Sequence, residues 1–225
     1  MNYKTSFSAR LRIKLQLAYG SKEGKNTTLP SGQNAPAWFR DYLIVTHSII
    51  RSSVPLMQAA YGRCCDLSEE GKLMTELRKY YKKHIQEEMN HDEWLLDDLQ
   101  SIGVSRQESL LRKPLQTVAE LVGSQYYWIY YWHPVCLLGY ISFLEGDPPK
   151  KELIDQLQKI TGYPKTAFRT LVKHSDLDPH HRDELNELLE TLPLTAKYEQ
   201  WITSNALYSA NKLIEIRNQS SALYE

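Results

Sequence analysis

The chain has 225 residues, 42% of them hydrophobic, and it carries 27 basic and 27 acidic side chains, so its formal net charge is zero. This size allows one well-formed hydrophobic core, and the lack of a basic excess argues against a nucleic-acid-binding surface. The longest apolar stretch, around residues 135–144, is too short to span a bilayer, so we expect no membrane insertion.

The first 36 residues differ in character from the rest of the chain. Residues 9–18, ARLRIKLQLA, form a short amphipathic stretch, and residues 20–36 are rich in Gly, Ser, Asn and Pro, which is typical of a flexible connection or a lid. We therefore divide the chain into an N-terminal segment over residues 1–36 and a helical domain over residues 37–220.

Beyond residue 37 the apolar residues recur with a helical period, and the alternation typical of strands does not occur. The run QYYWIYYWHPVCLLGYISFLEG is hydrophobic on nearly every face, which predicts a buried helix kinked at Pro134. The other predicted helices cover residues 38–63 with an interruption at Pro55, 72–101 with Gly103 as C-cap, 116–122 ending at Gly123, 151–160, 164–174, 179–191 and 195–217. The predicted fold class is all-α, a bundle of about seven helices.

One pattern of side chains occurs twice, about 90 residues apart. The two copies are His84-x-x-x-Glu88-x-x-His91 and His174-x-x-x-Asp178-x-x-His181. On one helix, offsets of four and seven residues return to within about 60° of the same direction, so each copy can point two imidazoles and a carboxylate at one spot. Mixed imidazole and carboxylate ligands suit iron, manganese and zinc, and carboxylate-x-x-His pairs build the di-metal sites of helical bundles.

A third element offers one more carboxylate. Glu145 closes the aromatic run, where an unpaired carboxylate is costly unless a metal or a cationic side chain offsets it, or unless the helix end is exposed. Glu87 lies near the ligand face of the first copy, but Glu88 lies between the two histidines by angle. In the second copy, Pro179 predicts a kink or a new helix with Asp178 as its N-cap, which is the alternative to a ligand role for this residue.

Further residues are candidates for the surroundings of such a site. His47 is either a pocket residue or a packed core residue, and His133, beside Pro134, is either a structural or a substrate-facing histidine. The candidate pocket walls, for most of which core packing is the default, are Tyr127, Tyr130, Tyr131 and Trp132. Cys136 competes as a nucleophile, but among apolar neighbours a thiol behaves as a small hydrophobe. No catalytic residue is expected apart from the metal ligands.

The order of these motifs resembles the haem-oxygenase-like di-iron oxidases, in the branch called iron-containing redox enzyme. The residues that carry the resemblance are Glu88, His91, Glu145, His174, Asp178 and His181, and it covers roughly residues 38–215. The resemblance implies a seven-helix fold, two iron ions or an iron–manganese pair, and O2 as co-substrate. It also implies oxidation of a small molecule (an amino acid, amine or fatty-acid-like compound) by N-oxygenation or oxidative C–C cleavage, in a biosynthetic pathway.

The chain departs from this family at one point. Members commonly place a carboxylate seven to ten residues before the first ligand histidine, where this chain has Tyr81-Lys-Lys-His84. Either His84 replaces that carboxylate, or Glu87 or Glu88 serves from a shifted position. The first metal site is therefore less fully defined than the second, and His84 would make it richer in nitrogen.

Other functions on the same scaffold are weighed beside this one. A metal-free enzyme like the TenA-type thiaminases or the pyrroloquinoline quinone synthase would use Cys136 or histidines, and a non-enzymatic helical binding protein would rely on the N-terminal stretch. A haem protein would leave the paired carboxylates unexplained. By analogy with the family we expect a homodimer and an external electron donor, and the three cysteines and the lack of a signal peptide favour the cytoplasm.

Overall fold

The computed structural model describes residues 5–23, 32–67 and 71–221, and within these ranges all regular structure is helical, which confirms the all-α prediction. The elements are α1 (Phe7–Glu23), η1 (Gly32–Asn34), α2 (Ala35–Ile50), α3 (Ser53–Asp66), α4 (Lys72–Glu88), α5 (His91–Ser101), α6 (Arg106–Leu111), α7 (Gln116–Tyr131), η3 (Pro134–Cys136), α8 (Leu137–Leu144), α9 (Lys151–Thr161), η4 (Lys165–Phe168), α10 (Arg169–Thr191) and α11 (Ala196–Ser221), where η marks a 3-10 helix. Among these helices, none combines the length and the apolar character needed to cross a membrane.

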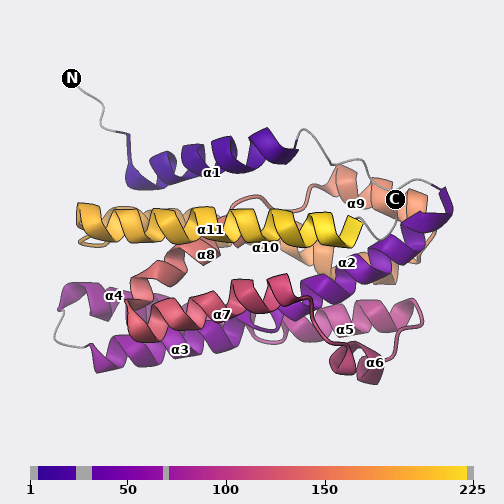
Figure 1. The fold of residues 1–225 in the computed structure, drawn as a ribbon, viewed down its shortest axis with the longest axis horizontal. Helices are drawn as coiled ribbons and strands as arrows, with labels where there is room; N and C mark the ends of the chain where they lie inside the picture. Colours follow the sequence, from indigo (N-terminus) through magenta and orange to yellow (C-terminus); the bar gives the residue numbers. More distant parts are fainter. Residues whose placement is uncertain (1–4, 24–31, 68–70, 222–225) are drawn as a thin grey trace.

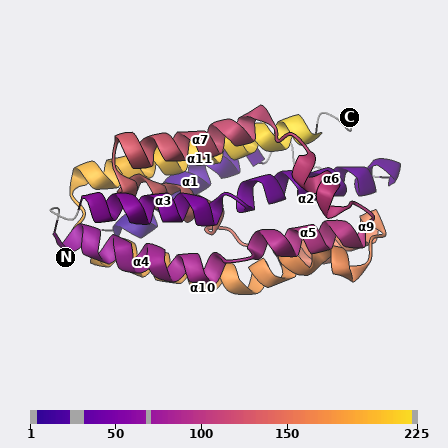
Figure 2. The ribbon, with the colours of Figure 1, turned by 90° about the horizontal axis from the view of Figure 1, so that it is seen from below.

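Two rows of consecutive helices form the body of the bundle. α2 continues into α3 and α4 into α5, and the rows lie side by side because α3 packs on α4 and α2 on α5 (Figure 2). α10 packs against α5, while α11 lies against α8 and is covered in turn by α1 (Figure 1). α4, α5, α8 and α10, which carry the candidate ligands, are therefore neighbours within the bundle.

The two long helices expected for residues 38–63 and 72–101 are each two helices. The first breaks at Arg51–Ser52, so that Pro55 lies in the first turn of α3, where its missing N–H costs nothing. The second breaks at Met89, which is extended, and Asn90, which has a left-handed φ of 69° that asparagine tolerates better than most residues. His91 therefore begins α5, and the prediction that it shares one helix with His84 is wrong.

The aromatic run is not a single buried helix. α7 passes through Gly123 and ends at Tyr131, so the predicted end at Gly123 is also wrong. Its outer face carries side chains that are half or more exposed, namely Tyr127, Tyr130, Tyr131 and Trp132. The sequence analysis also missed α6, although Ser105 and Glu108 give its start: the Ser105 hydroxyl accepts the Glu108 N–H at 3.1 Å.

α10 runs without interruption from Arg169 to Thr191 and includes Pro179. A new helix does not begin at Pro179, and Asp178 is a buried residue in the middle of α10 rather than an N-cap. Proline removes one backbone donor from the ladder, but the packing of α10 on its neighbours outweighs this loss.

The N-terminal segment is part of the bundle as far as it is described. Phe7 and Leu11 of α1 belong to the main hydrophobic cluster, and Arg10 pairs with Glu199 of α11 at 2.6 Å. The division at residue 36 therefore does not separate α1 from the helical domain. Of the expected flexible connection, residues 24–31 lie outside the described residues.

Two hydrophobic clusters fill the bundle, and a polar seam lies between them. α4 contributes Leu77 and Ile85 to the larger cluster, and α5 contributes Leu95 and Leu99 to the smaller one. α10 likewise places Leu171 in the smaller cluster and Leu185 and Leu189 in the larger. The polar residues of both repeated motifs fall between these apolar groups, so the seam follows from the order of residues along each helix.

Gly139 is the tightest point of the frame. A Cβ built on it would lie 2.2 Å from the Ile202 carbonyl oxygen and 2.8 Å from the Ala206 nitrogen, both backbone atoms of α11. We predict that Gly139→Ala lowers the free energy of unfolding by about 1–3 kcal/mol, as overpacking does. The matched control is Gly62→Ala, an exposed helical site with open space, which should be neutral or stabilising. Denaturant unfolding of both variants measures the difference in stability. Equal unfolding midpoints would contradict the close packing of α8 on α11.

Asp98 of α5 fixes the beginning of α10. Its carboxylate is fully buried and accepts the backbone N–H of Thr170 at 2.9 Å, which is otherwise an unpaired donor of the first turn. We predict that Asp98→Ala costs about 1–3 kcal/mol of unfolding free energy, because it orphans this donor. Asp97→Ala serves as control, since its exposed pair with Arg106 is worth only about 0–1 kcal/mol. Thermal unfolding should separate the two variants, and a loss as large for Asp97 would refute the capping role.

Candidate metal centre

The last turns of α4 supply two buried polar side chains. His84 and Glu88 are 2% and 8% exposed, four residues apart on one face of the helix. The ring of Tyr80 stacks on that of His84 with centroids 5.2 Å apart and restricts its orientation. α4 therefore aims an imidazole and a carboxylate into the polar seam.

Glu145, at the end of α8, meets His84. Its Oε1 lies 2.7 Å from His84 Nε2. Burial lowers the pKa of His84, but the hydrogen bond and charge of Glu145, together with Glu88 and Glu87, outweigh it and raise the pKa to about 9. Burial raises the pKa of Glu145 although His84 opposes this, and a carboxylate at a helix C-terminus is also disfavoured by the helix dipole. The pair is thus an imidazole–carboxylate contact shielded from water.

Glu88 lies between two further imidazoles. Its Oε2 is 3.0 Å from His91 Nδ1, and its Oε1 is 3.5 Å from His181 Nδ1. Burial raises the pKa of Glu88, but the hydrogen bond and charge of His91 and the charge of His84 outweigh it and hold the pKa below the ordinary value. A carboxylate whose oxygens face two different imidazoles is placed to bridge two cations.

α10 completes the group with its own triplet. His174 Nδ1 lies 2.8 Å from Asp178 Oδ1, and the ring of His174 meets that of His91 edge-on at 5.0 Å. The ring of His181 meets that of His84 edge-on at 4.9 Å. The structure therefore brings all seven predicted ligands into one continuous set of contacts. Within it, the ligand atoms of four residues lie within 4.8 Å of one another, those of His84, Glu88, Glu145 and His181.

The donor atoms of this cluster fit a bound cation. Several are buried without a hydrogen-bond partner among the described residues, namely His174 Nε2, His181 Nδ1 and Glu145 Oε2. Each unsatisfied buried polar atom costs about 1–3 kcal/mol. Iron, manganese or zinc bound by imidazole and carboxylate would satisfy these atoms together, and would offset the mutual repulsion of the buried carboxylates.

Two residues beside the cluster were missed by the sequence analysis. The ring of Trp94 stacks on His91 with centroids 4.0 Å apart, and the Lys173 ammonium lies 3.5 Å from the centroid of the Trp94 ring. Trp94 follows His91 by three residues, so a helical offset could have indicated this contact. Lys173 comes from α10 and required knowledge of how α5 and α10 pack.

Three further residues predicted near the site, Glu87, His47 and His133, differ in how they relate to the candidate ligands. Glu87 faces the outer side of His84, with its Oε2 3.5 Å from Nδ1. His47 is buried, and its pKa is lowered by burial and by Arg51, while the carboxylates that act on it are those of α5 rather than of the cluster. His133 accepts the Val135 N–H at 3.0 Å and packs on Tyr198, which is a structural role at the start of η3.

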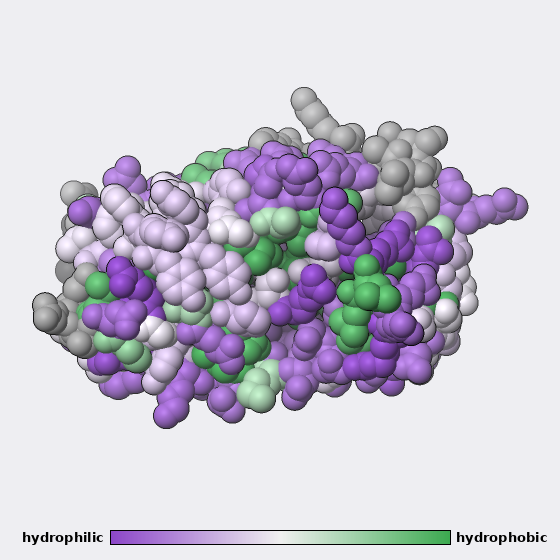
Figure 3. Space-filling view, turned by 60° about the horizontal axis from the view of Figure 1, so that its bottom comes forward, coloured by the Kyte–Doolittle hydropathy of each residue, from purple (hydrophilic) through white to green (hydrophobic). Residues whose placement is uncertain are grey.

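The four aromatic side chains predicted as pocket walls do not surround the cluster. They lie on α7 and at its C-cap, and they are half or more exposed. Figure 3 shows that residues of intermediate hydropathy, drawn in pale shades, gather on one part of this face of the molecule. A small cavity of about 20 Å³ adjoins the cluster instead. Its walls come from α3 (Ser53, Leu56 and Met57), from α8 with its C-cap (Leu137, Tyr140, Ile141, Leu144 and Glu145), and from α4 (His84 and Glu88).

Cys136 lies in the core, away from these ligands. The thiol is buried, and burial raises its pKa to about 12, so the thiolate that a nucleophile requires is strongly disfavoured. This supports the packing role and gives no support to a cysteine-dependent mechanism.

The comparisons with known proteins agree with this architecture. No curated protein matches the sequence. A solved domain of unknown function with a heme oxygenase-like fold from Shewanella denitrificans OS217 is similar with a TM-score of 0.80 and 20% identity, over 96% of this chain and 92% of that one. A TenA homolog from Pseudomonas syringae pv. tomato has a TM-score of 0.69 and 11% identity, over 96% and 93%. Both likenesses establish the haem-oxygenase-like fold.

The family follows from the sequence itself. Residues 53–208 match the model of a family described as iron-containing redox enzyme, and the matched range includes all seven candidate ligands. The chain therefore belongs to the family of iron-containing redox enzymes.

Proposed function

We propose that this protein is a non-haem di-iron oxidase or oxygenase that uses O2 to oxidise a small organic substrate. The observation that carries the proposal is the position of Glu88 between His91 and His181. It divides the other ligands into two sets that share one carboxylate. One set is His84, Glu145 and His181, and the other is His91, His174 and Asp178.

Each set offers two imidazoles and a carboxylate in addition to Glu88. The imidazoles hold the metals, and three carboxylates offset most of the charge of two divalent ions. An iron–manganese pair would suit the same donors. Bound iron would supply the redox chemistry by which O2 is reduced and the substrate oxidised, and we infer that an external donor returns the electrons.

The small cavity between α3 and α8 is the place we propose for the reacting group of the substrate. It reaches His84, Glu88 and Glu145, and its other walls are mostly aliphatic. None of the described residues that line it is Lys or Arg, so the walls favour an apolar substrate group. The hydroxyls of Ser53 and Tyr140 are the polar groups of the far walls that could orient a substrate.

Metal loading tests the proposal directly. Protein loaded anaerobically with Fe(II) should retain close to two irons per chain by elemental analysis, and exposure to O2 should consume oxygen faster than free Fe(II) at the same concentration. Protein that retains no iron after desalting would overturn the proposal.

A neighbouring pair of histidines provides a matched test of the ligands. His181→Ala should weaken Fe(II) binding at least tenfold, because it removes an imidazole that faces Glu88 and His84. His180→Ala should bind iron like the wild type, because that side chain is 68% exposed and pairs with Glu184 instead. Equal affinities of the two variants would contradict the assignment of His181.

A further inference from the structure

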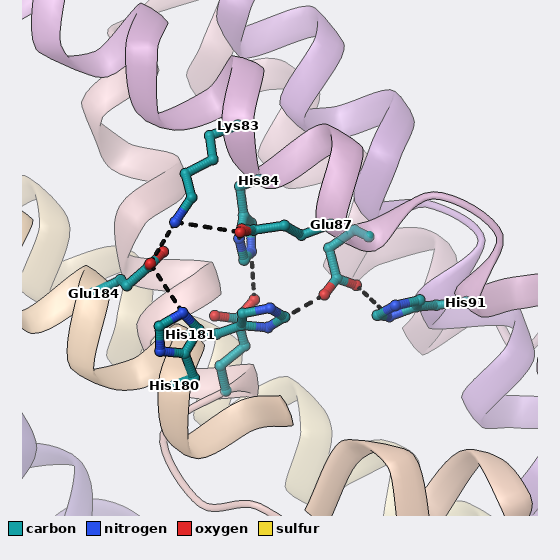
Figure 4. Close-up of polar contacts among 9 residues, drawn as sticks. Lys83, His84, Glu87, His91, His180, His181 and Glu184 are labelled. Carbon is teal, nitrogen blue, oxygen red and sulfur yellow. Dashed lines mark hydrogen bonds and ion pairs between the residues drawn. The ribbon is translucent and has the colours of Figure 1, made fainter. Parts of the chain in front are cut away.

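His84 has two ring nitrogens with different surroundings. Nε2 points into the cluster, 2.7 Å from Glu145 Oε1, whereas Nδ1 faces Glu87 at 3.5 Å (Figure 4). A histidine that binds a metal through one nitrogen usually donates the proton of the other to a carboxylate, a carbonyl or water. The carboxylate at Nδ1 of His84 is thus in the position of an orienting partner rather than of a ligand.

The two carboxylate oxygens of Glu87 differ in their contacts. Its Oε1 lies 3.2 Å from the Lys83 ammonium, one turn earlier on α4. Its Oε2 is buried and has no hydrogen-bond partner among the described residues, and it is the oxygen that faces His84. Leaving this atom unsatisfied is costly, and a small rotation would let it accept the Nδ1 proton.

Lys83 ties this arrangement to α10. Its ammonium also forms an ion pair with Glu184, and Glu184 in turn lies 3.1 Å from the exposed His180 (Figure 4). Side chains of α4 and α10 are thereby joined on the solvent side of the cluster. Glu87 is thus paired with a lysine that a carboxylate of α10 also holds, which restricts where the Glu87 side chain can lie.

We propose that Glu87 is the positioning residue of His84: it accepts a hydrogen bond from Nδ1–H, and so leaves Nε2 free to bind a metal beside Glu145, while Lys83, itself paired with Glu184, holds Glu87 in place. The inference rests on the proposed metal site and assigns Glu87 a role distinct from that of a ligand. Without this partner, the contact of Nε2 with Glu145 would favour the tautomer that carries its proton on Nε2, which is the nitrogen needed for the metal.

A double-mutant cycle with Co(II) as the probe tests this. Full-length wild type, Glu87→Ala, His84→Ala and the double variant are titrated anaerobically with Co(II), and the visible absorption of the bound ion is recorded. Glu87→Ala should weaken binding about tenfold and shift the band, but should change affinity less than twofold once His84 is alanine. Glu87→Gln, which retains an acceptor oxygen, should restore most of the affinity.

The control on the same helix is Glu76→Ala, which removes the exposed Glu76–Lys79 pair and should leave Co(II) binding unchanged. Thermal unfolding of the metal-free variants checks that each is folded. Equal losses from Glu87→Ala with and without His84 would overturn the inference, and so would a loss in Glu87→Gln as large as in Glu87→Ala, which would indicate direct ligation. A wild type that binds neither Co(II) nor Fe(II) would overturn the proposed function as well.

Discussion

The burial of charge between two hydrophobic clusters is the constraint on which this structure depends. Carboxylates and imidazoles from α4, α5, α8 and α10 converge where the two clusters meet, in a place that water reaches poorly. Burying such groups unpaired is costly, so the bundle closes only if they satisfy one another or share a cation. The contacts of Glu145 with His84 and of Glu88 with two imidazoles meet part of this requirement, and the unpaired donor atoms mark the part that remains.

The helices that carry the candidate ligands are held in place by contacts outside the cluster. The close approach of α8 to α11 at Gly139 holds α8, the helix that Glu145 caps, against the frame. Asp98 joins the first turn of α10 to α5, the helix that begins with His91. The spacing of the ligands is therefore set by packing and capping contacts that touch none of them.

Much of this could be predicted from the sequence, because helical periodicity and the repeated motif are local signals. The all-α class came from the helical period and the two triplets of candidate ligands from their spacing, whereas Glu145 was chosen because it closes the aromatic run. The turn at Asn90 was missed because a left-handed asparagine leaves the apolar pattern intact, and the continuity of α10 through Pro179 depends on tertiary packing. The exposure of the α7 aromatics and the contact of Lys83 with Glu184 likewise depend on which helices meet.

The walls of the cavity beside the cluster come from helices with different roles. Its inner side is made of ligands and of α8, which Gly139 ties to the frame, whereas the opposite wall comes from α3, a helix without a candidate ligand. Leu56 and Met57 therefore face the candidate ligands from a helix that supplies none of them, and both belong to the main hydrophobic cluster. With the substrate placed as proposed, its selectivity would be set on α3 and its reactivity on the helices that carry the candidate ligands, under the added requirement that any new side chain on α3 still fills the core.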